Sequence, residues 1–375
     1  MTAGLIPPPP TSGGSSLSEP PADSEPNLGD PEAVTPAAGN LDEAHSENAI
    51  ELKEVEGLSQ GRIVMRRFFR HRGAMISLAV VIIIILLAFS AEGIDALGIV
   101  IKGWWKYRWT DIDNIQNGGQ PTLSLWPLHW GNHPFGQDSL GRDVFALVMR
   151  GTQQSIMIVV IVGILSTVIG VVVGSLSGFF RGWIDTLLMR FTDAIIIIPL
   201  IVLTAVLGRT YGNLGSFVLA IVLGLASWTG LARLVRGEVL ALREREFVDA
   251  ARVAGASSGR IMFLHILPNA VGVVVVNTTL LMSATILTEA AISFLGFGVQ
   301  QPDVSLGSII NLYQNAFNTR PWLFFSPVIF IILIALAINF IGDGLRDAFD
   351  PRQKRALNKA ARKSAAAARQ KATAR

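Results

Sequence analysis

The sequence predicts an all-α membrane protein with six transmembrane helices and both termini in the cytoplasm. Half of the 375 residues are hydrophobic, only 16% are charged, and the mean hydropathy is +0.47. Several runs reach the length of about 20 uncharged residues that a helix needs to cross a hydrocarbon core about 30 Å thick. Arginine and lysine gather beside these runs in the alternating pattern of the positive-inside rule.

Residues 1–60 precede the first apolar run and form an acidic segment. They contain eleven Asp or Glu residues against one base, Lys53, and are rich in Pro, Ser and Gly. Such a composition buries too little apolar surface to offset the entropy lost on ordering. A disordered cytoplasmic tail is therefore predicted. A signal peptide is not, because a basic start and an apolar core are both missing.

Residues 61–100 are predicted to be a cytoplasmic arginine-rich entry followed by the first transmembrane helix, at about 74–97. Five arginines stand directly before the apolar run: Arg62, Arg66, Arg67, Arg70 and Arg72. Residues 101–152 are then predicted to be an extracellular loop. It holds five of the eight tryptophans, namely Trp104, Trp105, Trp109, Trp126 and Trp130, as suits rings at a membrane interface.

Residues 153–345 are predicted to hold the other five helices. Their apolar runs lie at about 153–180, 184–208, 214–235, 269–295 and 322–341. Six arginines occur from Arg233 to Arg260, whereas the links near Asn213 and Asp303 are poor in bases, so the loop 237–268 is predicted to be cytoplasmic. Residues 346–375 complete the chain as a basic cytoplasmic tail, with nine Lys or Arg and no acid after Pro351.

The stretch EFVDAARVAGASSGRIMFLHILPN, residues 246–269, interrupts the apolar pattern. One narrow helical face is expected to carry Phe247, Ala250, Ala251 and Ala254. Acids in the first turn suit the helix dipole, a left-handed glycine can end the helix, and a serine can cap a second short helix before Pro268. The residues by themselves leave open an interfacial helix, a packed loop or a docking surface.

This stretch resembles the EAA signature of ATP-binding cassette importer permeases, which reads Glu-Ala-Ala, three residues, Gly, nine residues, Ile, one residue, Leu-Pro. Asp249-Ala250-Ala251, Gly255 and Leu267-Pro268 occupy the matching positions, with Asp in place of Glu. His265 replaces Ile, as in the HILPN ending of the dipeptide, oligopeptide and nickel branch. Residues 133–155 and 287–310 are similar to the same branch, and in particular to its second permease subunit, which has a MetI-like transmembrane domain.

The resemblance implies a non-catalytic permease subunit of a dipeptide or oligopeptide importer in the bacterial plasma membrane, forming half of the translocation pathway. The expected partners are a second homologous permease, two cytoplasmic ATP-binding subunits, an extracellular or periplasmic substrate-binding protein and membrane lipid, but no nucleic acid. Nickel or another small solute is the alternative cargo. The coupling residues that it implies are Glu246, Phe247, Asp249, Ala250, Ala251, Ala254, Gly255, Ala256 and Ser257.

No cofactor is expected in this chain. The phosphate-binding pattern G-x-x-x-x-G-K-[ST] does not occur, so ATP and Mg are assigned to partner subunits. The absence of cysteine removes Cys-ligated zinc, and the five histidines form no H-E-x-x-H, so no metal site is expected. A proton-coupled secondary transporter using Asp193 and Glu289 is an alternative, but it leaves the docking segment unexplained. No Ser and His pair or paired aspartates indicate an intramembrane hydrolase.

Two groups within the apolar runs stand out. Gly163, Gly170, Gly174 and Gly178 share one helical face and predict close helix packing. Glu289 lies in the fifth run, where an ionised carboxylate is costly. It is assigned to the translocation pathway or the permease interface, with a carboxylate hydrogen-bonded between helices as the alternative.

Overall fold

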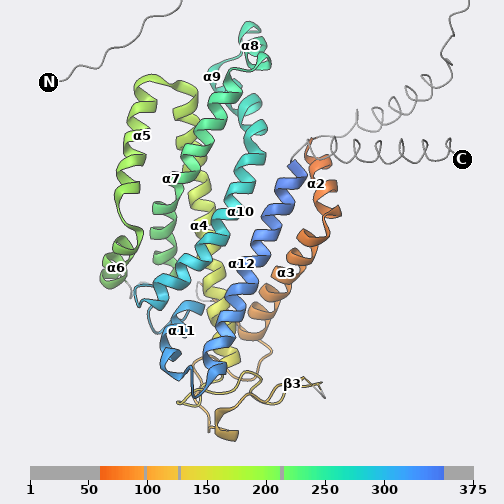
Figure 1. The fold of residues 1–375 in the computed structure, drawn as a ribbon, viewed down its shortest axis with the longest axis vertical. Helices are drawn as coiled ribbons and strands as arrows, with labels where there is room; N and C mark the ends of the chain where they lie inside the picture. The colour runs from red at the N-terminus through yellow and green to blue at the C-terminus, as the bar shows by residue number, and fades with distance from the viewer. Residues whose placement is uncertain (1–59, 97–98, 126–127, 212–214, 350–375) are drawn as a thin grey trace, which may run out of the picture. The chain divides into compact units, whose positions relative to one another are not determined.

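The computed structural model describes residues 60–96, 99–125, 128–211 and 215–349. Residues 1–59 of the predicted acidic tail and residues 350–375 of the predicted basic tail lie outside the described residues, as do Leu97, Trp126 and Asn213. Within that part of the chain the fold is helical (Figure 1). Its helices are α2 (Gln60–Arg70), α3 (Arg72–Glu92), α4 (Val144–Phe180), α5 (Gly182–Ile197), α6 (Leu200–Tyr211), α7 (Ser216–Arg243), α8 (Glu246–Val253), α9 (Ser258–Arg260), the π-helical turn η3 (Ile261–Ile266), α10 (Leu267–Phe294), α11 (Leu306–Tyr313), the 3₁₀ turn η4 (Gln314–Ala316) and α12 (Pro321–Phe349).

Five continuous helical stretches are long and apolar enough to cross a membrane. They are α3, α4, α7, the continuous run Ser258–Phe294 and α12. The predicted span at 184–208 is instead a pair, α5 and α6, bent by 73°. The bend falls at Ile198 and Pro199, because proline lacks an N–H and restricts the residue before it. Counting the bent pair as one span, the six predicted spans are all present; the orientation of the termini stays a prediction.

Two predicted boundaries beside the first long loop were wrong. The first apolar helix ends at Glu92, because Gly93 takes φ 86° and starts strand β1 (Gly93–Ala96), which pairs antiparallel with β2 (Ile99–Lys102). Helix α4 begins at Val144 instead of residue 153, since the Asp143 carboxylate caps it by accepting a 2.7 Å hydrogen bond from the Ala146 N–H. The predicted loop 101–152 is therefore residues 93–143.

The segment between α3 and α4, residues 93–143, is called the cap below. Besides the β1–β2 hairpin it contains the turn η1 (Asn117–Gly119) and a second short hairpin, β3 (Ser124–Leu125) with β4 (Leu128–His129). Figure 1 places it at the end of the described helices opposite α8. Most of the cap has no regular secondary structure, and its conformation depends on side-chain contacts together with irregular backbone hydrogen bonds, such as Gln137 N–H to the Gly119 carbonyl and Thr122 N–H to the His133 carbonyl.

Helix α4 lies at the centre of the packing and contacts α3, α7, α10 and α11. The largest buried cluster joins Phe145 and Leu147 of α4 to Leu306 of α11 and Ile334 of α12. Burying each such side chain contributes about 1.5–3 kcal/mol relative to exposure, so this contact fixes the cap end of the bundle.

The predicted glycine face of α4 lies against α7 and α10. A Cβ at Gly174 would come within 2.5 Å of the Ala232 carbonyl oxygen, and one at Gly178 within 2.8 Å of the Arg236 carbonyl oxygen, both on α7. Gly170 is similarly close to Leu231 of α7, and Gly163 to Met282 of α10. Larger side chains at these positions would push the helices apart.

Candidate functional site: the α8 surface and the buried polar groups

Helix α8 is the short helix that the EAA-like stretch predicts, and it is anchored on one side only. Val248 is fully buried in a cluster with Val239 of α7 and Ile261 of η3. Ala251 and Ala256 pack partly buried against the same cluster. This packing ties α8 to both α7 and the turn that leads into α10.

The exposed side of α8 differs from the predicted face in two residues. Phe247 is 40% exposed and Val253 is 90% exposed, while Ala250 and Ala254 are also exposed. Ala251, which the sequence placed on the docking face, points toward the buried cluster with Val248. The sequence analysis missed Val253, although it lies three residues after Ala250, a spacing that places both on adjacent parts of one helix face. The exposed apolar residues of α8 are therefore Phe247, Ala250 and Val253, with Ala254 at the C-cap, and the charged residues Glu246, Asp249 and Arg252 are exposed beside them.

The ends of α8 are formed as the sequence predicts. Glu246 and Asp249 lie in its first turn, and Asp249 Oδ1 accepts a 2.8 Å hydrogen bond from Arg252 Nη1. Gly255 takes φ 80°, the left-handed conformation that ends the helix. Ser257 then caps α9, with its Oγ accepting from the Arg260 N–H. These caps fix a sharp corner at the tip of the loop.

Ion pairs join α5 to α7 on the same side of the molecule as α8. Arg236 donates two hydrogen bonds to Asp185, of 2.6 and 2.7 Å, and Arg233 donates one of 2.5 Å to Asp193. Asp193 therefore has an ion-pair partner on α7. Since α7 also carries Val239, the residues that anchor α8 belong to a helix with several fixed contacts.

Glu289 lies inside the bundle, away from solvent. Its side chain is fully buried, and its two oxygens accept hydrogen bonds from Ser155 of α4, at 2.9 Å, and from Ser293 of α10, at 2.8 Å. The Ser155 hydroxyl oxygen also accepts from the Leu306 N–H of α11. Glu289 thus occupies the position of a carboxyl group hydrogen-bonded between helices, which was the structural alternative for this residue.

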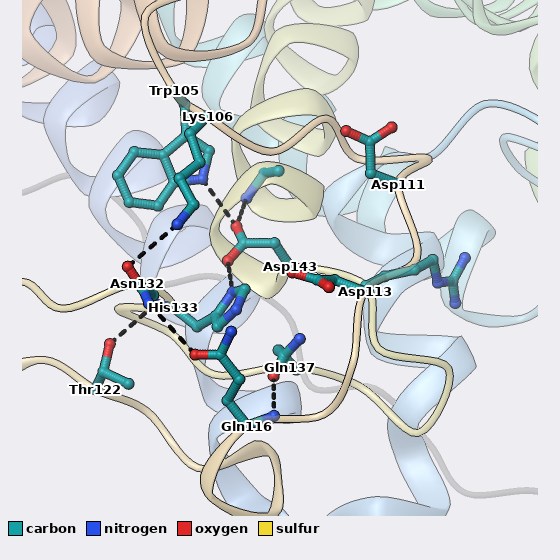
Figure 2. Close-up of polar contacts among 12 residues, drawn as sticks. Trp105, Lys106, Asp111, Asp113, Gln116, Thr122, Asn132, His133, Gln137 and Asp143 are labelled. Carbon is teal, nitrogen blue, oxygen red and sulfur yellow. Dashed lines mark hydrogen bonds and ion pairs between the residues drawn. The ribbon is translucent and has the colours of Figure 1, made fainter.

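The cap is built around a buried pair, His133 and Asp143 (Figure 2). His133 Nδ1 lies 2.7 Å from Asp143 Oδ2, and Trp105 Nε1 donates a 3.1 Å hydrogen bond to Asp143 Oδ1. The Tyr107 ring stacks on His133 with 4.5 Å between centroids. Burial raises the pKa of Asp143, while the hydrogen bonds from the Ala146 N–H, His133 and Trp105 oppose this rise.

A second buried cluster joins the cap to α11. Asp138 Oδ2 accepts hydrogen bonds of 2.7 Å from both Arg142 Nε and the Tyr313 hydroxyl. Burial, and then the Asp138 charge, raises the pKa of Tyr313 well above its usual range, so the phenol remains a donor. Sequence reasoning missed both clusters. The only signal was the family resemblance at residues 133–155, a stretch that contains His133, Asp138, Arg142 and Asp143.

Residues 170–355 match the family described as binding-protein-dependent transport system inner membrane component, and residues 59–96 match the N-terminal TM domain of oligopeptide transport permease C. The oligopeptide transport system permease protein OppC of Mycobacterium bovis is 38% identical over 79% of this chain and 96% of its own length. The chain belongs to this permease family. It is accordingly a multi-pass inner membrane component of a transport system, and its described residues supply five candidate spans, or six with the bent pair α5 and α6.

Two further relatives span most of this inner membrane permease. The OppC protein of Haemophilus influenzae is 34% identical over 81% of this chain and 93% of its own length. A putative peptide permease protein of Brucella ovis is 40% identical over 66% of this chain and 80% of its own length. A solved inward-facing MetNI methionine ABC transporter covers 54% of the permease chain and 96% of its own, with 20% identity and a TM-score of 0.46.

Proposed function

We propose that the chain is the permease subunit of an ATP-binding cassette importer for oligopeptides. The observation that carries this proposal is the 38% identity to a protein named oligopeptide transport permease over 96% of that protein's length. In this function the chain forms half of the translocation pathway, and a second homologous permease forms the other half. An external binding protein delivers the peptide, and two cytoplasmic subunits bind ATP and Mg and hydrolyse the nucleotide.

The α8 surface supports a coupling role. Its inner side is fixed by Val248 and Ala251, and its outer side presents Phe247 and Val253 beside the small residues Ala250 and Ala254 and the exposed Asp249–Arg252 ion pair. Small residues let a partner's groove approach closely, and exposed apolar side chains supply the contact. Because packed interiors transmit displacement with little compression, a push on α8 reaches α7 and α10 through Val239 and Ile261.

The test uses the purified assembly of both permeases and the ATPase subunits in lipid vesicles with the binding protein. Val253→Glu places a charge in the apolar contact, so ATPase retention and oligopeptide uptake should each fall by about tenfold or more, as for a contact residue worth about 2 kcal/mol. Ile112→Glu is the matched control, because Ile112 is 70% exposed but lies in the cap. It should leave ATPase retention unchanged.

Two results would contradict the proposal. Full ATPase retention and peptide uptake by Val253→Glu would remove α8 from the coupling contact. Peptide uptake by the permeases without any ATPase would instead indicate a secondary transporter. Nickel uptake measured with the same vesicles tests the alternative cargo: ATP-dependent uptake of nickel without uptake of peptide would indicate a nickel importer.

A further inference from the structure

A groove with a volume of about 1090 Å³ lies between α2, the first half of α10 and the last turn of α12. Its size is slightly above the range of about 300–1,000 Å³ that is usual for small-molecule sites. The walls are mostly apolar, with Val64 of α2 facing Val271, Val275 and Leu280 of α10. Since η3 runs directly into α10, the groove lies at the α8 end of the bundle.

The groove has a basic rim. Arg67 and Arg346 are among its lining residues, and Arg67 Nη1 donates a 3.3 Å hydrogen bond to the Ala348 carbonyl. Arg62, Arg66 and Arg70 are exposed along α2 at intervals of four residues. The nearby acid Asp347 does not line the groove and pairs with His71 at 3.4 Å. Positive charge therefore dominates one end of an apolar cavity.

The rim lies where the membrane span begins. His71 caps α3, whose apolar run starts within its first turn, so Arg67 and Arg70 stand within about one turn of the hydrocarbon boundary. At this level lipid phosphates meet basic side chains, and basic pockets between membrane helices bind anionic head groups. An apolar groove with a cationic end matches an amphiphile, whereas a water-filled cavity would need several polar partners along its wall.

We propose that this groove binds an anionic phospholipid of the leaflet on the α8 side. The acyl chains lie along the wall formed by Val271, Val275 and Leu280, and the phosphate lies between Arg67 and Arg346. The arginine stems cover apolar surface while their charged ends remain at the boundary. The lipid would connect α2 to α10, the helix that follows the α8 loop.

The test measures lipid binding to the purified transporter assembly by native mass spectrometry. The probe is palmitoyl-oleoyl phosphatidylglycerol, compared with phosphatidylcholine of the same chains. A surface arginine contributes about fivefold to anionic-lipid binding, so Arg67→Gln with Arg346→Gln should weaken phosphatidylglycerol binding about 25-fold and leave phosphatidylcholine binding unchanged. Arg62 lies on the same helix but does not line the groove. Arg62→Gln should therefore weaken phosphatidylglycerol binding less than Arg67→Gln or Arg346→Gln does alone.

A second variant tests the apolar wall. Val271 is 44% exposed, so Val271→Trp fills the groove without disturbing the core and should reduce binding of both lipids. Ile76→Trp on α3 is the control, since Ile76 is exposed but does not line the groove. Glycerophosphoglycerol, which has no acyl chains, should not compete.

Three results would overturn the proposal. They are unchanged phosphatidylglycerol preference in the double arginine variant, equal competition by glycerophosphoglycerol, and cross-linking of the Val271→Cys variant to the partner permease or to another segment of this chain. The chain has no native cysteine, so the last experiment reads a single site.

Discussion

Buried carboxyl groups at two positions show how single residues hold this permease together. Asp143 accepts from a histidine, a tryptophan and a helix N-terminus, whereas Glu289 accepts from two serines on different helices. Burial of a charged group is costly unless its lone pairs are used, and each group has several donors. Both residues therefore order their surroundings, one in the cap and one between α4 and α10.

Asp143→Asn should destabilise the cap. The amide has one acceptor oxygen and a new N–H₂ group, so it cannot accept from His133, Trp105 and the Ala146 N–H together. The expected loss is about 2 kcal/mol in the free energy of unfolding, measured as a lower thermal midpoint of the purified assembly. Asp113→Asn is the control, because its exposed carboxylate accepts only from the next N–H among the bonds found in the described residues. A normal midpoint for Asp143→Asn would contradict this account.

Glu289→Gln should lower stability by about 1 kcal/mol and leave peptide uptake unchanged when equal amounts of assembled transporter are compared. The reason is that the group is fully buried and its partners are serines of the same chain. Uptake into vesicles and a thermal melt of the same preparation check the two expectations. Loss of peptide uptake with an unchanged thermal midpoint would indicate that Glu289 takes part in the translocation pathway.

At the scale of elements, hydropathy and glycine spacing predict more than boundaries do. The apolar runs locate every candidate span of the described residues, but the charge of Arg150 left the predicted span starting at Gln153, after the true start of α4 at Val144. Those side chains have partners that a sequence cannot display, namely Asp303 at 3.1 Å and the Ala88 carbonyl at 2.9 Å. The bend at Pro199 was not predicted, because the apolar run 184–208 continues through it, and its angle depends on packing.

Gly174→Ala should weaken the contact between α4 and α7. The new Cβ would lie 2.5 Å from a backbone oxygen that cannot rotate away, so a cost of about 1–3 kcal/mol is expected. Gly237→Ala on α7 is the matched control, because nothing lies within 4 Å of its Cβ position, and it should gain up to about 1 kcal/mol of helix propensity. Equal thermal midpoints for the two variants would show that the helices can separate freely.

For the whole molecule, the sequence predicts the number of spans, the permease family and the α8 loop. It does not predict the cap, because its irregular backbone is fixed by contacts between residues far apart in sequence, such as Trp105 with Asp143 and Asp138 with Tyr313. The sequence also could not predict that Ala251 points toward the buried cluster. That orientation depends on Val248 meeting η3, a contact that helical periodicity within eight residues cannot specify.

The predicted orientation places the cap outside and α8 inside. Because the chain has no cysteine, single cysteines at Asp113 in the cap and Ser258 in α9, both exposed, can report it. A membrane-impermeant maleimide added to intact cells should label Asp113→Cys, and Ser258→Cys only after permeabilisation. The opposite labelling pattern would show that the topology is reversed, with α8 outside the cell, where a cytoplasmic ATPase cannot bind it.

Helix α4 has 37 residues and so runs for about 55 Å, well beyond a hydrocarbon core of about 30 Å. Its first residue follows Asp143, and its last turns lie against the α7 backbone near Arg236. A rigid rod of this length is a lever: a pivot of about 5° at its middle shifts the two ends by about 2.5 Å in opposite directions. Tilting the helix on one side of the membrane would thus displace the cap on the other side, with no change in the backbone hydrogen bonds within the helix itself.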